Sequence, residues 1–86
     1  MYSDRIQAEV ALYPLREPDL GPAILAFVED LRRPGVEVTP GPMSTLVVGE
    51  AGEVFAALQG AYEAAARRGQ VVLRVTLVNP GPQADG

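Results

Sequence analysis

Apolar and polar residues alternate along residues 5–13. The apolar positions of this segment are Ile6, Ala8, Val10 and Leu12. A period of two residues is typical of a strand with one buried face. Residues 36–39 and 70–79 alternate in the same way, and residues 43–49 are rich in Thr, Leu and Val, which favour strands. We therefore expect four strands, with residues 40–42 (Pro-Gly-Pro) forming a turn, a bulge or an edge segment between the second and the third.

Two other segments repeat apolar residues every three or four positions, which indicates amphipathic helices. The first follows the loop at residues 16–22 and ends at residues 34–35, a Pro-Gly pair that stops a helix. Asp19 or Gly21 can cap its start, and Pro22 suits a first helical turn. The second covers residues 51–68 and stops at Gly69.

The resulting order is β-α-β-β-α-β, which predicts a single α+β domain of the ferredoxin-like type over residues 1–80. We expect an antiparallel sheet with strand order 4-1-3-2, covered on one face by both helices because the crossovers are right-handed. Residues 81–86 contain no core residue and are expected to form a flexible tail.

The first and third strands are expected to be central and parallel to one another. That direction would place Ser44 and Thr45 near Glu9, and Tyr13 toward the other end of the sheet. Asn79, at the end of the fourth strand, would return to the Ser44 end. The sequence therefore predicts two polar clusters, which a face-to-face dimer would unite.

Composition removes several classes of function. The 86 residues include no cysteine and no histidine, which excludes a disulfide framework, a metallochaperone cysteine pair and a Ser-His-Asp triad. Seven arginines against eleven acidic residues give a net charge of -4, which argues against nucleic-acid binding. No apolar run reaches the roughly 20 residues of a membrane span, and the polar start lacks a signal core. We expect a cytoplasmic protein with no cofactor and no metal.

The sheet face opposite the helices is expected to mix small, apolar and polar residues, as contact surfaces often do. One interpretation is dimerisation of this face and nothing more. Glu9 lies in the middle of it, near Thr76 and Arg74 of the fourth strand. Glu9 can form a cross-strand ion pair with Arg74, or it can accept a hydrogen bond from a ligand.

Two further features on this sheet have both a structural and a functional interpretation. Residues 41–45 (Gly-Pro-Met-Ser-Thr) can be a plain hairpin, or a loop of small residues that offers backbone groups and two hydroxyls to a ligand. Tyr13, at the end of a strand, can pack at the rim of the sheet or stack on a ligand ring.

Several of these segments together resemble one known family. Residues 10–15 (VALYPL), 41–45 (GPMST), Gly49, 54–58 (VFAAL) and the last strand are similar, in this order, to motifs of the thiamine-binding, YkoF-like family. The resemblance covers roughly residues 7–80. This chain differs from the family's common pattern at Arg16 and Glu17, and we expect a short Pro/Gly-rich tail after the last strand, where some members have a helix.

The resemblance implies a ferredoxin-like domain that binds thiamine or its hydroxymethylpyrimidine part, without catalysis, in salvage or transport of vitamin B1. It also implies a homodimer or homotetramer that pairs through open sheet faces. The ligand-binding residues it indicates are Glu9, Tyr13, Met43, Ser44 and Thr45, and Thr76 is their neighbour on the last strand. An aminopyrimidine offers an amino donor beside ring acceptors, which carboxylate, hydroxyl and backbone groups can match.

Other functions remain open at this point. A regulatory or structural homo-oligomer would have a closed apolar interface and no small ligand. A small dimeric enzyme could use Glu9 as a general base. An acylphosphatase shares the topology, but Arg16 is not surrounded by the Gly-rich loop that such an enzyme uses to bind phosphate.

Overall fold

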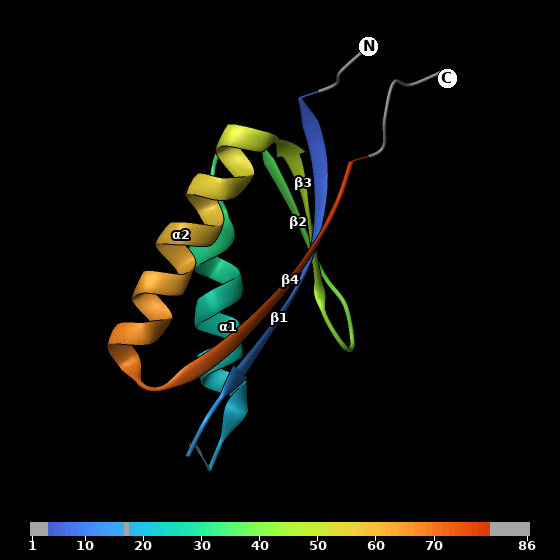
Figure 1. Ribbon diagram of the computed structural model, residues 1–86. Helices are drawn as coiled ribbons and strands as arrows, with labels where there is room; N and C mark the ends of the chain where they lie inside the picture. The colour runs from blue at the N-terminus through green and yellow to red at the C-terminus, as the bar shows by residue number, and fades with distance from the viewer. Residues whose placement is uncertain (1–3, 17, 80–86) are drawn as a thin grey trace.

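The computed structural model describes residues 4–16 and 18–79 and has the predicted order of elements (Figure 1). The elements are β1 (Arg5–Pro14), α1 (Leu20–Leu31), β2 (Val36–Pro40), β3 (Thr45–Glu50), α2 (Ala51–Arg68) and β4 (Val71–Val78). The predicted tail at residues 81–86 and the departure at Glu17 lie outside the described residues. No helix in the described part of the chain is long and apolar enough to cross a membrane.

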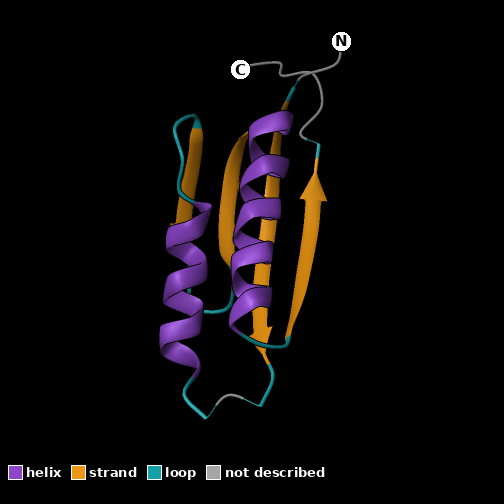
Figure 2. Cartoon of the chain, turned by 90° about the vertical axis from the view of Figure 1, so that its left-hand side faces the viewer, coloured by secondary structure: helices purple, strands orange, loops and turns teal. Residues whose placement is uncertain are grey.

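The four strands form one sheet in the order β2-β3-β1-β4, which is the predicted order read from the opposite edge. Every neighbouring pair is antiparallel. Both helices lie on the same face of the sheet (Figure 2). The architecture is consistent with a ferredoxin-like α+β fold, and it leaves the other sheet face without a covering layer.

The expectation that β1 and β3 run parallel was wrong. Val10 is opposite Thr45 and Arg5 is opposite Glu50, so the two strands are antiparallel. The connection through α1 makes β2 run in the same direction as β1, and the hairpin then reverses the chain. Because β3 is inserted between β2 and β1, it opposes both.

The core lies between the sheet and the helices. The alternating apolar residues of β1 are buried, as predicted, with Ala8 and Val10 at 0% and 1% exposure. Phe27 and Leu31 of α1 pack against them, together with Val47 of β3 and Val54 of α2. Burial of these side chains is the main favourable contribution to folding in a domain of this size.

Local signals set the ends of α1 and of the hairpin. The carboxylate of Asp19 accepts a hydrogen bond from the backbone N–H of Gly21 at 3.2 Å, so Asp19 is the N-cap and the helix begins at Leu20. Gly35 directly precedes β2, at the open end of the β2–β3 hairpin, and has a φ of +83°, a conformation that favours glycine. The carbonyl of Gly35 lies so close to Gly49 that a Cβ atom there would be 2.7 Å from its oxygen.

β4 is an edge strand that the helices cover only in part. Val71 and Leu73 pack against the core. Val75 and Leu77 follow on the same face, but they are 39% and 45% exposed. In Figure 2, β4 lies beside the helices rather than behind them. This strand therefore presents apolar side chains on both of its faces.

Candidate functional site

A hollow lies on the uncovered face of the sheet, where β1, β4 and the β2–β3 hairpin meet. It is lined by Glu9, Ala11 and Tyr13 of β1, Met43 and Ser44 of the hairpin, and Arg74 and Thr76 of β4. Five of the six predicted ligand-binding residues therefore line one hollow: Glu9, Tyr13, Met43, Ser44 and Thr76.

The antiparallel register is what brings these residues together. Pairing of Val10 with Thr45 places the hairpin loop beside the second half of β1, where Tyr13 lies. The predicted separation of Tyr13 from the Ser44 cluster was therefore wrong, and one subunit unites them. Asn79 follows Val78, which is opposite Gln7, so it lies at the other end of the sheet from Ser44.

The hairpin loop holds Ser44 through its backbone. The N–H of Gly41 donates a hydrogen bond of 2.8 Å to the carbonyl of Ser44. A Cβ atom on Gly41 would come within 2.9 Å of that same oxygen, so the close approach requires glycine. This contact fixes the loop where the side chain of Ser44 faces β1.

Glu9 is the central acceptor of the hollow. The Ser44 hydroxyl donates a hydrogen bond of 3.0 Å to the Oε2 atom of Glu9 and so orients the carboxylate. Across the strands, Glu9 is opposite Thr76 of β4 and Leu46 of β3. The carboxylate can still accept hydrogen bonds from a ligand, because an ionised carboxylate has about four acceptor sites.

Glu9 and Arg74 do not form the ion pair that the sequence left open. Arg74 is opposite Ala11 and lies two residues before Thr76 on β4, so it is a diagonal neighbour of Glu9. In the described part of the chain, the ion pairs within 4.0 Å join other arginines to other acidic residues. Arg74 was expected only as a possible partner of Glu9, but it also lines the hollow. The alternation of β4, which puts Arg74 on the open face, could have predicted this position.

Tyr13 and Met43 supply the apolar part of the hollow. Tyr13 is 45% exposed and Met43 is 88% exposed, so neither is a core residue. An aromatic ring and a flexible thioether are both suited to packing on the face of a planar ligand. The hollow therefore combines hydrogen-bonding groups with apolar surface.

Thr45 does not join this hollow. It is 7% exposed and lies opposite Val10, on the face of β3 that meets the helices. It lines a different recess, between α1 and the hairpin, with Phe27 and Pro42. Ser44 and Met43 also line this recess, so the hairpin loop borders both it and the hollow of the open face.

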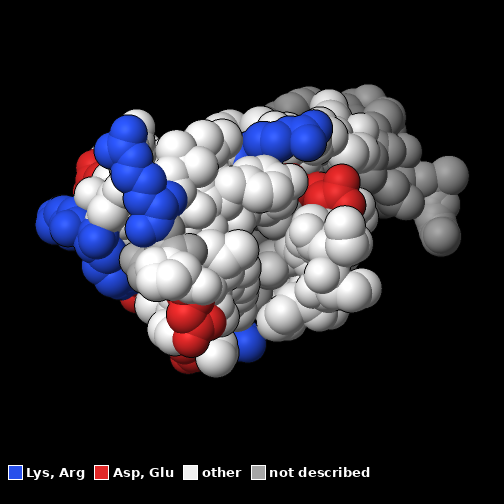
Figure 3. Space-filling model, turned by 90° about the horizontal axis from the view of Figure 1, so that it is seen from below, with Lys and Arg blue, Asp and Glu red and all other residues white. Residues whose placement is uncertain are grey.

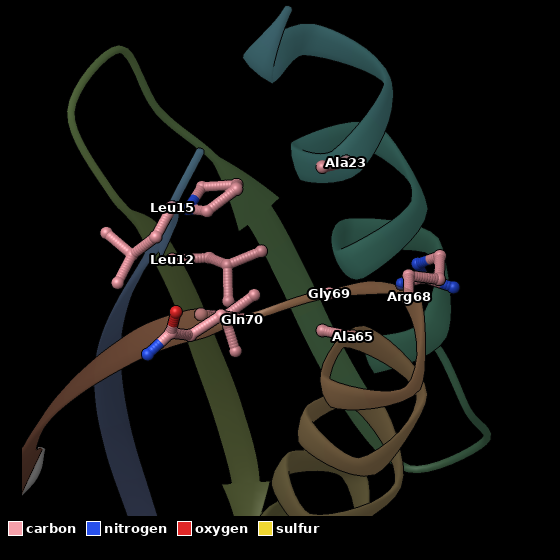
Figure 4. A pocket seen from close by; sticks show the side chains of 9 residues that line it. Leu12, Leu15, Ala23, Ala65, Arg68, Gly69 and Gln70 are labelled. Carbon is pink, nitrogen blue, oxygen red and sulfur yellow. The ribbon is translucent and has the colours of Figure 1, made fainter. Parts of the chain in front are cut away.

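A further hollow lies near the ends of the two helices (Figure 4). Its side chains are mainly apolar or small, including Leu12, Leu15, Ala23 and Ala65. Arg68 is the charged residue of its lining, and its guanidinium forms a 3.2 Å ion pair with Asp30. This hollow therefore offers no carboxylate or hydroxyl to orient a polar ligand.

Most of the surface seen from below is uncharged, and basic side chains gather at the left of this view (Figure 3). Over residues 4–16 and 18–79, no three acidic side chains come together as possible ligands of a metal ion.

Several solved structures are similar to this chain. A hypothetical protein, MJ1052 from Methanocaldococcus jannascii, matches with a TM-score of 0.83 and 17% identity over 98% of this chain and 87% of that one. A protein from Thermotoga maritima, TM0486, assigned provisionally to thiamine biosynthesis or salvage, matches with a TM-score of 0.75 and 19% identity, over 85% of this chain and 81% of that one.

A domain of unknown function from Bacillus cereus matches with a TM-score of 0.74 and 19% identity, over 88% of this chain and 76% of that one. At these identities the structures support the fold alone. No curated protein sequence matched the chain.

The sequence itself matches one family model, described as thiamine-binding protein, over residues 8–78. The match includes every residue that lines the hollow of the open sheet face. This agrees with the family resemblance seen in the sequence motifs. The chain belongs to the thiamine-binding protein family.

Proposed function

We propose that this protein binds the aminopyrimidine part of thiamine, either in thiamine itself or as free hydroxymethylpyrimidine. It acts in salvage or transport of vitamin B1 and catalyses no reaction. The observation that carries the proposal is the carboxylate of Glu9, oriented by Ser44 at 3.0 Å within a hollow of the open sheet face. Membership of the thiamine-binding family supports the class of ligand.

The chemistry of the hollow matches an aminopyrimidine. The exocyclic amino group is a donor that Glu9 can accept, and the ring nitrogens are acceptors for a hydroxyl such as that of Thr76. Tyr13 and Met43 can pack on the ring face. A charge-assisted hydrogen bond to Glu9 would contribute more than a neutral one, about 1.5–3 kcal/mol.

A second copy of the chain would close this hollow. Leu46, Val72 and Val78 lie on the same open face and are 39%, 45% and 47% exposed. Pairing of two open faces would cover these side chains and would exclude water from the bound ring. The proposed assembly is therefore a homodimer or a pair of such dimers in the cytoplasm, with no nucleic-acid or membrane partner.

Isothermal titration with hydroxymethylpyrimidine and with thiamine tests the proposal. The unchanged protein should give saturable heat at about one ligand per subunit. Glu9→Gln keeps the size of the side chain but removes its charge, and it should weaken binding by about tenfold or more. Glu37→Gln is the matched control, because Glu37 is exposed on β2 and does not line the hollow.

Gel filtration of the same samples gives the oligomeric state. A stable dimer that binds neither compound would contradict the proposal and would favour a structural or regulatory oligomer. Turnover of the ligand would instead indicate the enzyme alternative. Equal affinities of the Glu9→Gln and Glu37→Gln variants would remove Glu9 from the site.

A further inference from the structure

The hollow contains one group of each charge. Glu9 on β1 and Arg74 on β4 face the same side of the sheet. Glu9 is opposite Thr76 and Arg74 is opposite Ala11, and these two pairs follow one another on that face. Diagonal neighbours of this kind lie about 7–8 Å apart at their Cα atoms. A small ligand that touches one of these side chains is therefore within reach of the other.

These two charges do not neutralise one another. Glu9 is hydrogen-bonded to Ser44, and no carboxylate of residues 4–16 or 18–79 comes within 4.0 Å of the Arg74 guanidinium. By contrast, Arg68 is paired with Asp30 at 3.2 Å between the two helices. Arg74 is thus a cation of the hollow that is available to an anionic ligand group.

The chemistry of the ligand connects the two positions. In the pyrimidine, the amino group and the hydroxymethyl group are on neighbouring ring carbons. A ring whose amino group is bound to Glu9 carries its other substituent beside that amino group, where the long side chain of a diagonal neighbour such as Arg74 can reach it. In thiamine that substituent leads to a cationic thiazolium, whereas in the phosphate ester of the hydroxymethyl group it is an anion.

Arg74 distinguishes between these substituents by charge. A guanidinium repels a thiazolium, and it binds phosphate oxygens with two parallel N–H donors. We propose that the hollow prefers the phosphate monoester of hydroxymethylpyrimidine to thiamine, with Arg74 as the residue that determines this specificity. The inference rests on the proposed binding of an aminopyrimidine and goes beyond it in naming the charged form.

Titration at low salt with four compounds tests the inference: hydroxymethylpyrimidine, its phosphate ester, thiamine and inorganic phosphate. The ester should bind about tenfold more tightly than the free alcohol, and inorganic phosphate should bind far more weakly than either. Arg74→Gln should abolish the tenfold difference between ester and alcohol, because it removes the cation that binds the phosphate oxygens. Arg74→Lys should keep part of it, because it keeps the charge.

Arg67→Gln is the control for net charge, because Arg67 is exposed on α2, where it pairs with Glu63. This variant should keep the preference for the ester. Equal binding of ester and alcohol by the unchanged protein would overturn the inference. A preference for the ester that survives in Arg74→Gln would also overturn it. Neither result would contradict the proposed function. Failure of every pyrimidine to bind would overturn both.

Discussion

Gly49 is the position where a single methyl group should affect this fold most clearly. A Cβ atom there would lie 2.7 Å from the carbonyl oxygen of Gly35, and 3.4 Å from a methyl group of Val54. The oxygen belongs to the backbone of the turn between α1 and β2, which cannot rotate away as a side chain can. Gly49→Ala must therefore move β3 or the turn.

The magnitude follows from two opposing terms. Overpacking of a close contact costs about 1–3 kcal/mol. Loss of glycine's freedom in the unfolded chain recovers about 0.4–1 kcal/mol. The net loss of unfolding free energy is about 1–2 kcal/mol, which lowers the Tm of a domain of this size by about 5–15 °C.

Gly60→Ala provides the matched comparison. Gly60 lies exposed within α2, and a Cβ atom there would meet nothing within 4 Å. The same substitution should therefore raise stability by about 1 kcal/mol, through helix propensity alone. Both variants are measured by thermal unfolding followed by circular dichroism. A Gly49→Ala variant that melts at or above the unchanged protein would refute the reasoning about the close contact.

Two further changes test the helix cap and the apolar side of the hollow. Asp19→Ala removes the acceptor for the Gly21 N–H and should lower stability by about 1 kcal/mol, whereas Asp19→Asn should recover most of it in the same thermal assay. Unchanged melting of Asp19→Ala would show that the cap contributes nothing. Tyr13→Ala should weaken binding of hydroxymethylpyrimidine about fivefold or more with little change in Tm, because Tyr13 is 45% exposed and outside the core. Phe55→Ala, a change on the exposed face of α2, should leave the affinity as it is, and equal affinities of the two variants would count against ring packing on Tyr13.

The alternating residues of β1 and the two amphipathic segments were sufficient to predict the elements and the strand order. Their periods identify a buried face for each element, and right-handed crossovers then leave few topologies. The direction of β3 relative to β1 was wrong, because periodicity within a strand contains no information about its neighbour's direction. That direction follows from the topology, since a crossover followed by a hairpin makes β3 oppose β1.

The same error explains what the sequence missed in the candidate site. With β3 reversed, the hairpin loop carrying Ser44 lies beside Tyr13, so one subunit holds a hollow that seemed to need two. Thr45 was included because it follows Ser44 in a motif, but it is buried at 7% exposure and does not line this hollow. Arg74 was expected near Glu9, as a possible ion-pair partner. The structure shows instead that Glu9 accepts a hydrogen bond from Ser44, a contact between distant residues that periodicity does not reveal.

Mapping the binding site on the protein tests the central claim most directly. Two-dimensional NMR of ¹⁵N-labelled protein, titrated with hydroxymethylpyrimidine, reports which backbone amides sense the ligand. We expect saturable shifts centred on Glu9, Ser44 and Thr76, with little change around Leu15 and Gly69 at the other hollow. Shifts centred on Leu15 and Gly69, or none at millimolar ligand, would contradict the claim that the open sheet face binds an aminopyrimidine.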